Sequence, residues 1–188
     1  MIVPFSKVFI AGSEIENVEY LIDNQLDMGG NGLFTEKVNH FMEKRYDVKK
    51  VLLTTSATTA LEIAVRLSDL KKDDEVILPS FTFSSTANAV LVSSRAKLVF
   101  AEIDEKTLNI DPEDIEKKIT AKTRAIIVVH YAGVSCDMGR IMKIAKKNSL
   151  LVIEDAAQGI ESKFKNKYLG TIGDFGCLSF QTPKSLTC

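Results

Sequence analysis

The stretch Leu150-Leu151-Val152-Ile153-Glu154-Asp155-Ala156-Ala157-Gln158-Gly159 runs from apolar residues directly into an acidic pair. We predict a strand over residues 150–153, preceded by a helix over 138–147 and an apolar strand over 125–129. This strand–helix–strand order predicts parallel strands covered by helices. Ligands of such sheets bind at the carboxyl ends of the strands, so the residues after 153 are candidates for a functional site.

The same alternation continues toward both ends of the chain. It predicts an α/β fold with a mostly parallel sheet. Asp111-Pro112 is typical of a helix start, with Asp as the N-cap and Pro at the first helical position. Further strands are predicted over residues 51–53, 75–78, 97–100 and 176–180, and further helices over 13–25, 34–46, 57–67, 84–92 and 112–119.

Composition and charge exclude several classes of function. The 188 residues carry 24 Lys and Arg against 25 Asp and Glu, so the balanced charge gives no general attraction for nucleic acid or an anionic membrane. No apolar stretch approaches the roughly 18–20 residues of a membrane helix. The three cysteines, Cys136, Cys177 and Cys188, form no C-x-x-C pair, which fits neither a disulfide framework nor a zinc site. We therefore expect a cytoplasmic protein without a metal.

Small residues follow the predicted strand 51–53, in the sequence Thr54-Thr55-Ser56-Ala57-Thr58-Thr59-Ala60-Leu61. Their backbone N–H groups at the start of the next helix can hold a phosphate, although a simple Ser/Thr N-cap explains the same residues. Neither the G-x-G-x-x-G nor the G-x-x-x-x-G-K-[ST] pattern is present, which argues against a dinucleotide or P-loop site.

Three further signals lie at other predicted strand ends. The aromatics of Pro79-Ser80-Phe81-Thr82-Phe83 either pack in the core or stack on a planar ligand. Burying Glu154 and Asp155 is costly unless they meet donors or a cation, and a structural salt bridge or an N-cap is the alternative. Lys184 follows the last apolar strand, where a surface lysine is the simpler interpretation of that signal alone.

Together, a phosphate turn, an aromatic side chain, a buried Asp and a late Lys are what pyridoxal phosphate (PLP) requires. Asp155 would keep the pyridine nitrogen protonated through a charge-assisted hydrogen bond. Lys184 would form the Schiff base. The separation of 184 − 155 = 29 residues leaves room for one hairpin or short excursion between them.

With these motifs the sequence resembles the DegT/StrS family of sugar-nucleotide aminotransferases, which are fold-type-I PLP enzymes. The resemblance covers the chain from the Gly-rich tract 29–34 onward and implies a three-layer PLP-binding large domain. The motifs that carry it are Thr55-Ser56-Ala57-Thr58, Pro79-Ser80-Phe81-Thr82-Phe83, Glu154-Asp155-Ala156-Ala157-Gln158, and Ser179-Phe180 followed by Lys184.

The resemblance implies a role for each matching residue. Lys184 would bind the cofactor covalently and transfer protons, and Asp155 would pair with the pyridine nitrogen. Gln158 would hydrogen-bond the phenolic oxygen, and Phe83 would stack on the ring. The phosphate contacts would come from Ala57, Thr58 and Ser179. Related dehydratases carry His in place of the lysine, so Lys184 favours transamination.

The tracts 28–35, 130–138 and 169–173 are most similar to members that aminate position 4 of dTDP-4-keto-6-deoxyglucose. The resemblance implies that glutamate is the amino donor. It also implies that the product is used to make surface polysaccharide such as lipopolysaccharide. The full-length protein is implied to be a homodimer. His130 and Tyr131 stay outside the predicted catalytic set, because a packed or capping His130 explains the sequence at least as well as a substrate contact.

The chain departs from the family pattern after Lys184, because it ends at Cys188 where relatives continue into a Gly-rich segment and a small C-terminal domain. We expect residues 1–188 to be the N-terminal part of the PLP-binding large domain, without the small domain. We expect a longer parent protein to be the active transaminase. The alternatives are an inactive PLP-binding or interaction remnant and a different nucleotide-binding α/β domain.

Overall fold

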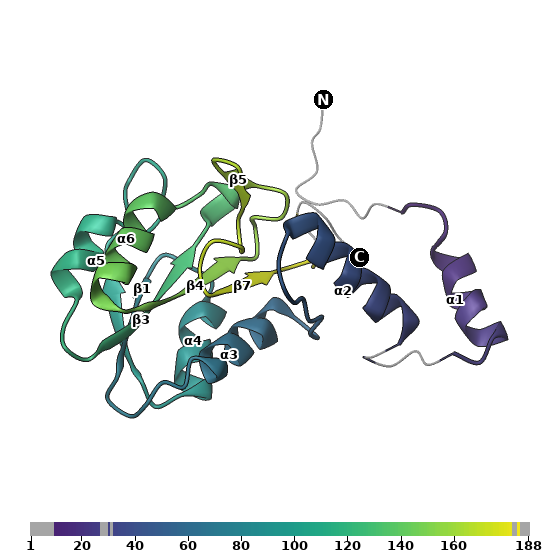
Figure 1. The fold of residues 1–188 in the computed structure, drawn as a ribbon, viewed down its shortest axis with the longest axis horizontal. Coiled ribbons are helices and arrows are strands. Elements are labelled where there is room, and N and C mark those ends of the chain that lie inside the picture. The colour runs from purple at the N-terminus through teal and green to yellow at the C-terminus, as the bar shows by residue number, and fades with distance from the viewer. Residues whose placement is uncertain (1–9, 27–29, 31, 182–183, 185–188) are drawn as a thin grey trace.

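A computed structural model describes residues 10–26, 30, 32–181 and 184, with a central sheet between helices and the first two helices extending away from it (Figure 1). Cys188 and parts of the Gly-rich tract 29–34 lie outside the described residues. The elements in chain order are α1 Glu14–Asp23, α2 Leu33–Tyr46, α3 Ala57–Leu67, β1 Glu75–Pro79, α4 Ser84–Ser93, β2 Lys97–Ala101, α5 Pro112–Lys118, β3 Thr123–Val129, the 3-10 turn η1 Tyr131–Gly133, α6 Met138–Asn148, β4 Leu151–Ala156, β5 Lys163–Phe164, β6 Lys167–Tyr168 and β7 Phe175–Leu178.

Five strands form one parallel sheet in the order β2-β1-β3-β4-β7. The register places Val129 of β3 and Cys177 of β7 on either side of Asp155 in β4. β5 and β6 form a hairpin between β4 and β7, and the two strands pair antiparallel. The predicted α/β fold class is therefore confirmed, and the carboxyl ends of β3, β4 and β7 lie side by side.

Helices cover both faces of the sheet, which gives three layers (Figure 1). On one face, α5 and α6 bury Ile115 and Ile141 against a core that includes Val152. On the other face, α3 and α4 bury Leu61 and Val90 against a core that includes Ile153. Because side chains of a strand alternate between faces, adjacent residues of β4 enter different cores.

Several helices begin where a short polar side chain satisfies the free backbone N–H groups of the first turn. The Asp111 carboxylate accepts from Glu113 N at 2.9 Å, as the Asp-Pro pair predicts. The Ser56 hydroxyl accepts from Thr59 N at 3.1 Å at the start of α3. These caps fix the α3 and α5 boundaries within one or two residues of those predicted.

The structure corrects two local predictions. Residues 51–53 form no strand, because Val51 N donates to Glu43 of α2 and Leu53 N donates to Asn39 of the same helix. These side-chain acceptors take the place of a neighbouring strand. The apolar side chains of α2 differ in burial, since Met42 is 6% exposed and Phe41 is 65% exposed. Strand β4 runs on to Ala156, so the acidic pair lies within the strand.

Two absences hold for the described part of the chain. None of its helices is both long and apolar enough to cross a membrane. No group of three or more His, Cys, Asp or Glu side chains in it could hold a metal ion.

Candidate active site

Asp155 is a buried carboxylate near the carboxyl end of β4. It is 5% exposed, and its Oδ2 accepts from the Thr86 hydroxyl at 2.8 Å while its Oδ1 accepts from Ala157 N at 3.2 Å. Burial is the largest influence and raises the pKa of the Asp155 carboxyl. The hydrogen bonds from Thr86 and Ala157 and the charge of Lys184 act to lower that pKa without overcoming burial. Within the described residues, burial therefore outweighs the groups that stabilise the ionised form of Asp155.

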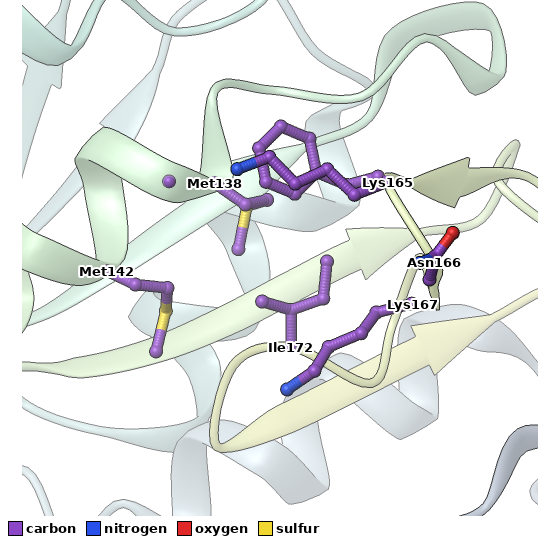
Figure 2. Close-up of a pocket in the computed structure, with 8 residues that line it drawn as sticks. Met138, Met142, Lys165, Asn166, Lys167 and Ile172 are labelled. Atoms are coloured by element: carbon purple, nitrogen blue, oxygen red, sulfur yellow. The ribbon is translucent and has the colours of Figure 1, made fainter.

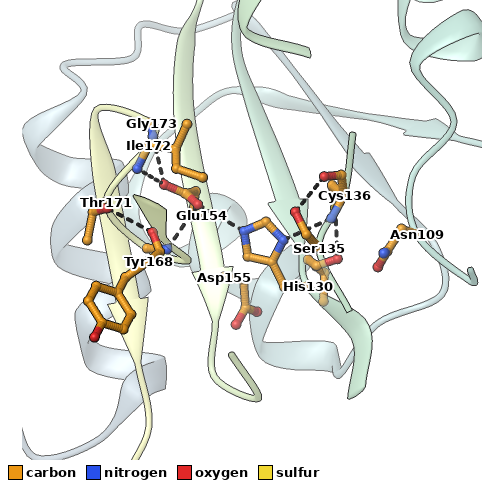
Figure 3. A network of polar contacts seen from close by, with 12 residues as sticks. Asn109, His130, Ser135, Cys136, Glu154, Asp155, Tyr168, Thr171, Ile172 and Gly173 are labelled. Atoms are coloured by element: carbon orange, nitrogen blue, oxygen red, sulfur yellow. Dashed lines mark hydrogen bonds and ion pairs between the residues drawn. The ribbon is translucent and has the colours of Figure 1, made fainter. Parts of the chain in front are cut away.

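Glu154, the neighbour of Asp155, faces the opposite side of the sheet and serves a structural network (Figure 3). Its Oε2 lies 2.9 Å from Nε2 of His130, and both side chains are fully buried. Cys136 N donates to Nδ1 of His130 at 3.2 Å. Nδ1 is therefore an acceptor, so Nε2 carries the proton and donates to Glu154. His130 is thus packed and hydrogen-bonded, the simpler of its two interpretations.

The same Glu154 carboxylate also holds the loop between β6 and β7. It accepts from Gly170 N at 2.9 Å and from Ile172 N and Gly173 N at 2.6 Å each (Figure 3). Burial works to raise the pKa of Glu154, but the hydrogen bonds from His130, Gly173 and Gly170 outweigh it and leave that pKa below its usual value. Glu154 is therefore an ionised anchor of the segment that leads into β7.

The first turn of α3 lies near the carboxyl ends of the strands. The other end of α3 leads into the loop before β1, and that loop lies at the amino ends of the strands. Ala57 and Thr58 occupy this turn and are partly buried. Ser179 follows β7, is 7% exposed, and accepts from Gln181 N at 3.3 Å through its hydroxyl. Because α3 and β7 share one core, the predicted phosphate residues come from neighbouring elements.

The remaining predicted residues lie in the segments that follow β1, β4 and β7. Phe83 is the N-cap of α4 and is 76% exposed, whereas Phe81 packs against Tyr131 with ring centroids 4.9 Å apart. Gln158 is exposed, and its Oε1 accepts from Ala132 N at 2.6 Å. Lys184 is half-buried, and its backbone N donates to Gln181 O at 2.8 Å. Phe83 is therefore the aromatic of the pair that is free to contact a ligand.

Asp155 fits a protonated pyridine nitrogen. A carboxylate has about four lone-pair sites, and the described donors to Asp155 are two. A buried carboxylate is stabilised by a cationic donor, which a pyridinium N–H supplies. An apolar hollow of about 490 Å³ between α6 and the β5–β6 hairpin is a separate feature, because none of the predicted site residues lines it (Figure 2).

Thr86 is the site residue that sequence reasoning missed. It lies on the buried face of α4 with Ala89 and Val90, at the i, i+3, i+4 spacing of a helix, and it is fully buried. A polar residue within an apolar stripe was the signal that could have identified it. Its partner in β4 lies 69 residues along the chain, which no local pattern indicates.

Comparisons with known proteins identify the family. The model of the DegT/DnrJ/EryC1/StrS aminotransferase family matches residues 10–188. The spore coat polysaccharide biosynthesis protein SpsC of Bacillus subtilis is 39% identical, with 97% of this chain and 46% of that protein covered. GDP-perosamine synthase of Escherichia coli O157:H7 is 34% identical, with 98% and 50% covered.

Among solved structures, a sugar aminotransferase from Streptococcus pneumoniae, determined in PLP and PMP forms, matches with a TM-score of 0.90 and 27% identity. The match covers 98% of this chain and 50% of that one. The chain thus spans about half the length of the curated relatives it matches. The family uses PLP, and the chain belongs to the DegT/DnrJ/EryC1/StrS aminotransferase family.

Proposed function

We propose that the whole protein containing this chain transfers an amino group from glutamate to a nucleotide-linked 4-keto-6-deoxy sugar, with PLP as cofactor. Asp155 is the observation that carries this proposal. It is a buried carboxylate with free acceptor capacity near the carboxyl end of β4, and it accepts a hydrogen bond from Thr86 of α4. A charge in such a position is costly without a cationic partner, so it favours a ligand that brings one.

The chain's own residues then divide the work of holding the cofactor. Asp155 accepts a hydrogen bond from the protonated pyridine nitrogen, and Phe83 offers an exposed ring for stacking. Gln158 lies across from η1 and donates its amide to the phenolic oxygen. The backbone N–H groups of the α3 first turn, at Ala57 and Thr58, bind the phosphate together with the Ser179 hydroxyl.

Lys184 completes this set as the covalent attachment point and as the base that moves a proton between the amino donor and the cofactor. When bound, PLP supplies a ring that withdraws electrons from the carbon attached to the amine. A lysine amine, unlike an imidazole, can both bind the cofactor covalently and return a proton. Lys184 therefore favours transamination over sugar dehydration.

The relatives support the substrate class. GDP-perosamine synthase and a spore coat polysaccharide protein are both similar to this chain, which favours a nucleotide sugar destined for surface polysaccharide such as lipopolysaccharide. The choice of dTDP-4-keto-6-deoxyglucose rests on the tracts 28–35, 130–138 and 169–173. In this proposal, residues 1–188 are the N-terminal part of the PLP-binding large domain of a cytoplasmic homodimer.

The test is an assay of the whole protein with PLP and glutamate against dTDP-, GDP- and UDP-linked keto sugars. Mass spectrometry of the products should show an amino sugar and equimolar 2-oxoglutarate, with dTDP-4-keto-6-deoxyglucose the best substrate. Lys184→Ala should abolish turnover. Preferential amination of the GDP-linked or UDP-linked sugar would show that the proposed substrate is wrong. If a folded, PLP-loaded protein aminated none of the three sugars, the proposed activity would be refuted.

A further inference from the structure

Thr86 and Thr82 form a chain of hydroxyl groups that ends on Asp155. The Thr82 and Thr86 hydroxyl oxygens are 2.8 Å apart, and the Thr86 oxygen is 2.8 Å from Oδ2 of Asp155. Thr86 is fully buried and Thr82 is partly buried. No other residue in the described chain has a side chain that hydrogen-bonds the Asp155 carboxylate.

The number of protons that each group can donate decides which hydroxyl donates in each of these two hydrogen bonds. A threonine hydroxyl has one proton to give, and an ionised carboxylate can only accept. Thr86 therefore donates to Asp155, which leaves its oxygen free to accept the proton of Thr82. A valine would fill the same volume on the apolar face of α4, so the hydroxyl is explained by its bond to the carboxylate rather than by packing.

The two threonines also flank the exposed aromatic. Thr82 precedes α4 and Thr86 lies in its first turn, and Phe83 lies between them as the N-cap of α4. The bond from Thr86 to β4 therefore fixes the start of α4 relative to the sheet. One hydroxyl pair orients the carboxylate and sets the position of the segment that carries Phe83.

We propose that Thr86 is a positioning residue for the cofactor, holding Asp155 as an acceptor aimed at the pyridine nitrogen, with Thr82 supporting it. This inference rests on the proposed function, because it gives Thr86 a role only if PLP binds at Asp155. Removing the hydroxyl leaves Oδ2 free to turn away from the ring and leaves the carboxylate less well stabilised as an anion.

The test uses the whole protein and compares Thr86→Val, Thr86→Ser and Thr82→Val. The matched control is Thr123→Val. Thr123 is a buried threonine, 2% exposed, and it lies at the start of β3, at the end of the strand away from the site. The readouts are the dissociation constant of PLP and the ¹⁵N chemical shift of the ring nitrogen in ¹⁵N-labelled PLP. Circular dichroism checks that each variant folds.

Thr86→Val should weaken PLP binding about tenfold or more, as expected for loss of a hydrogen bond to a charged group, and should move the ¹⁵N shift toward the unprotonated ring. Thr86→Ser should restore both values to near wild type, and Thr82→Val should change them in the same direction but less. Thr123→Val should leave both unchanged.

A double-mutant cycle separates positioning from packing. If Thr86 acts through Asp155, Thr86→Val should have no further effect on PLP binding in an Asp155→Asn background. Equal losses in both backgrounds, or wild-type binding and ¹⁵N shift in folded Thr86→Val, would overturn the proposal. If Thr86→Val does not fold, wild-type values in Thr82→Val together with no rescue in Thr86→Ser would overturn it. A folded wild-type protein that binds no PLP would refute the proposed function itself.

Discussion

Replacement of Glu154 by Gln should destabilise the fold by about 3 kcal/mol. The carboxylate accepts from Ile172 N and Gly173 N through Oε1 and from Gly170 N and His130 Nε2 through Oε2. A glutamine keeps one acceptor oxygen, and its NH₂ group then faces two donors. Each buried donor left without an acceptor costs about 1–3 kcal/mol, so the two lost bonds give the stated value.

A tautomer change at His130 cannot repair this loss. Moving the proton to Nδ1 would let Nε2 accept from the new amide, but the Cys136 N–H would then face a second donor at Nδ1. At least one buried donor therefore stays unpaired in Glu154→Gln. Amide hydrogen exchange should detect the unpaired donor, because the Gly170 amide loses its acceptor and should exchange with solvent much faster than in the wild type.

The assay is urea unfolding of the apo protein followed by circular dichroism, with amide exchange of the 170–173 loop measured in parallel. Glu161→Gln is the matched control, because Glu161 makes an exposed ion pair with Arg45 and its loss should leave the unfolding midpoint close to wild type. A Glu154→Gln variant within about 0.5 kcal/mol of wild type, with unchanged exchange at Gly170, would refute the reasoning.

The pH dependence of this effect has a defined sign. The pKa of Glu154 is lowered in the folded state, so its contribution is complete above the usual pKa of an unfolded glutamate. It is lost as the pH falls through the lowered pKa. The stability difference between wild type and Glu154→Gln should therefore shrink in acid, and a difference that grew in acid would contradict the assignment of an ionised Glu154.

Three other predictions concern different parts of the molecule. Because burial raises the pKa of Asp155, its ionisation costs the folded apo protein stability at neutral pH. Asp155→Asn should therefore raise the urea unfolding midpoint of the apo protein at pH 7, an advantage that disappears below the usual pKa of an unfolded aspartate, while PLP binding falls. Asp111→Ala removes the acceptor at the start of α5 and should cost about 1 kcal/mol in urea unfolding. Burial raises the pKa of Cys136 and of Cys177 to about 12, so iodoacetamide at neutral pH should leave both thiols unmodified until the protein unfolds, as peptide mass mapping can check.

The acidic pair shows how far sequence reasoning reaches. The sequence indicates that burying Glu154 and Asp155 costs free energy, and it leaves open whether each has a structural or a functional role. Strand alternation separates them, because neighbouring side chains of β4 enter opposite cores. Glu154 meets four donors on the α5–α6 side, and Asp155 meets the hydroxyl of Thr86 on the α3–α4 side.

Local features of the fold were predictable from the sequence, whereas features that depend on contacts between distant parts of the chain were not. Helix starts such as those at Asp111 and Ser56 were predictable, because capping uses residues three or fewer positions apart. Residues 51–53 read as a strand, yet their N–H groups bond side chains of α2. The bond from Thr86 to Asp155 joins α4 to β4, so only the three-dimensional structure reveals it.

Reduction of the PLP-treated whole protein with borohydride tests the central claim most directly, because it fixes the cofactor to the amine that holds it. Peptide mass mapping should then locate a stoichiometric label on Lys184, and Lys184→Ala should remove it while a surface variant such as Lys147→Ala should not. Label spread over several surface lysines, or none on Lys184 in a folded protein, would contradict the account.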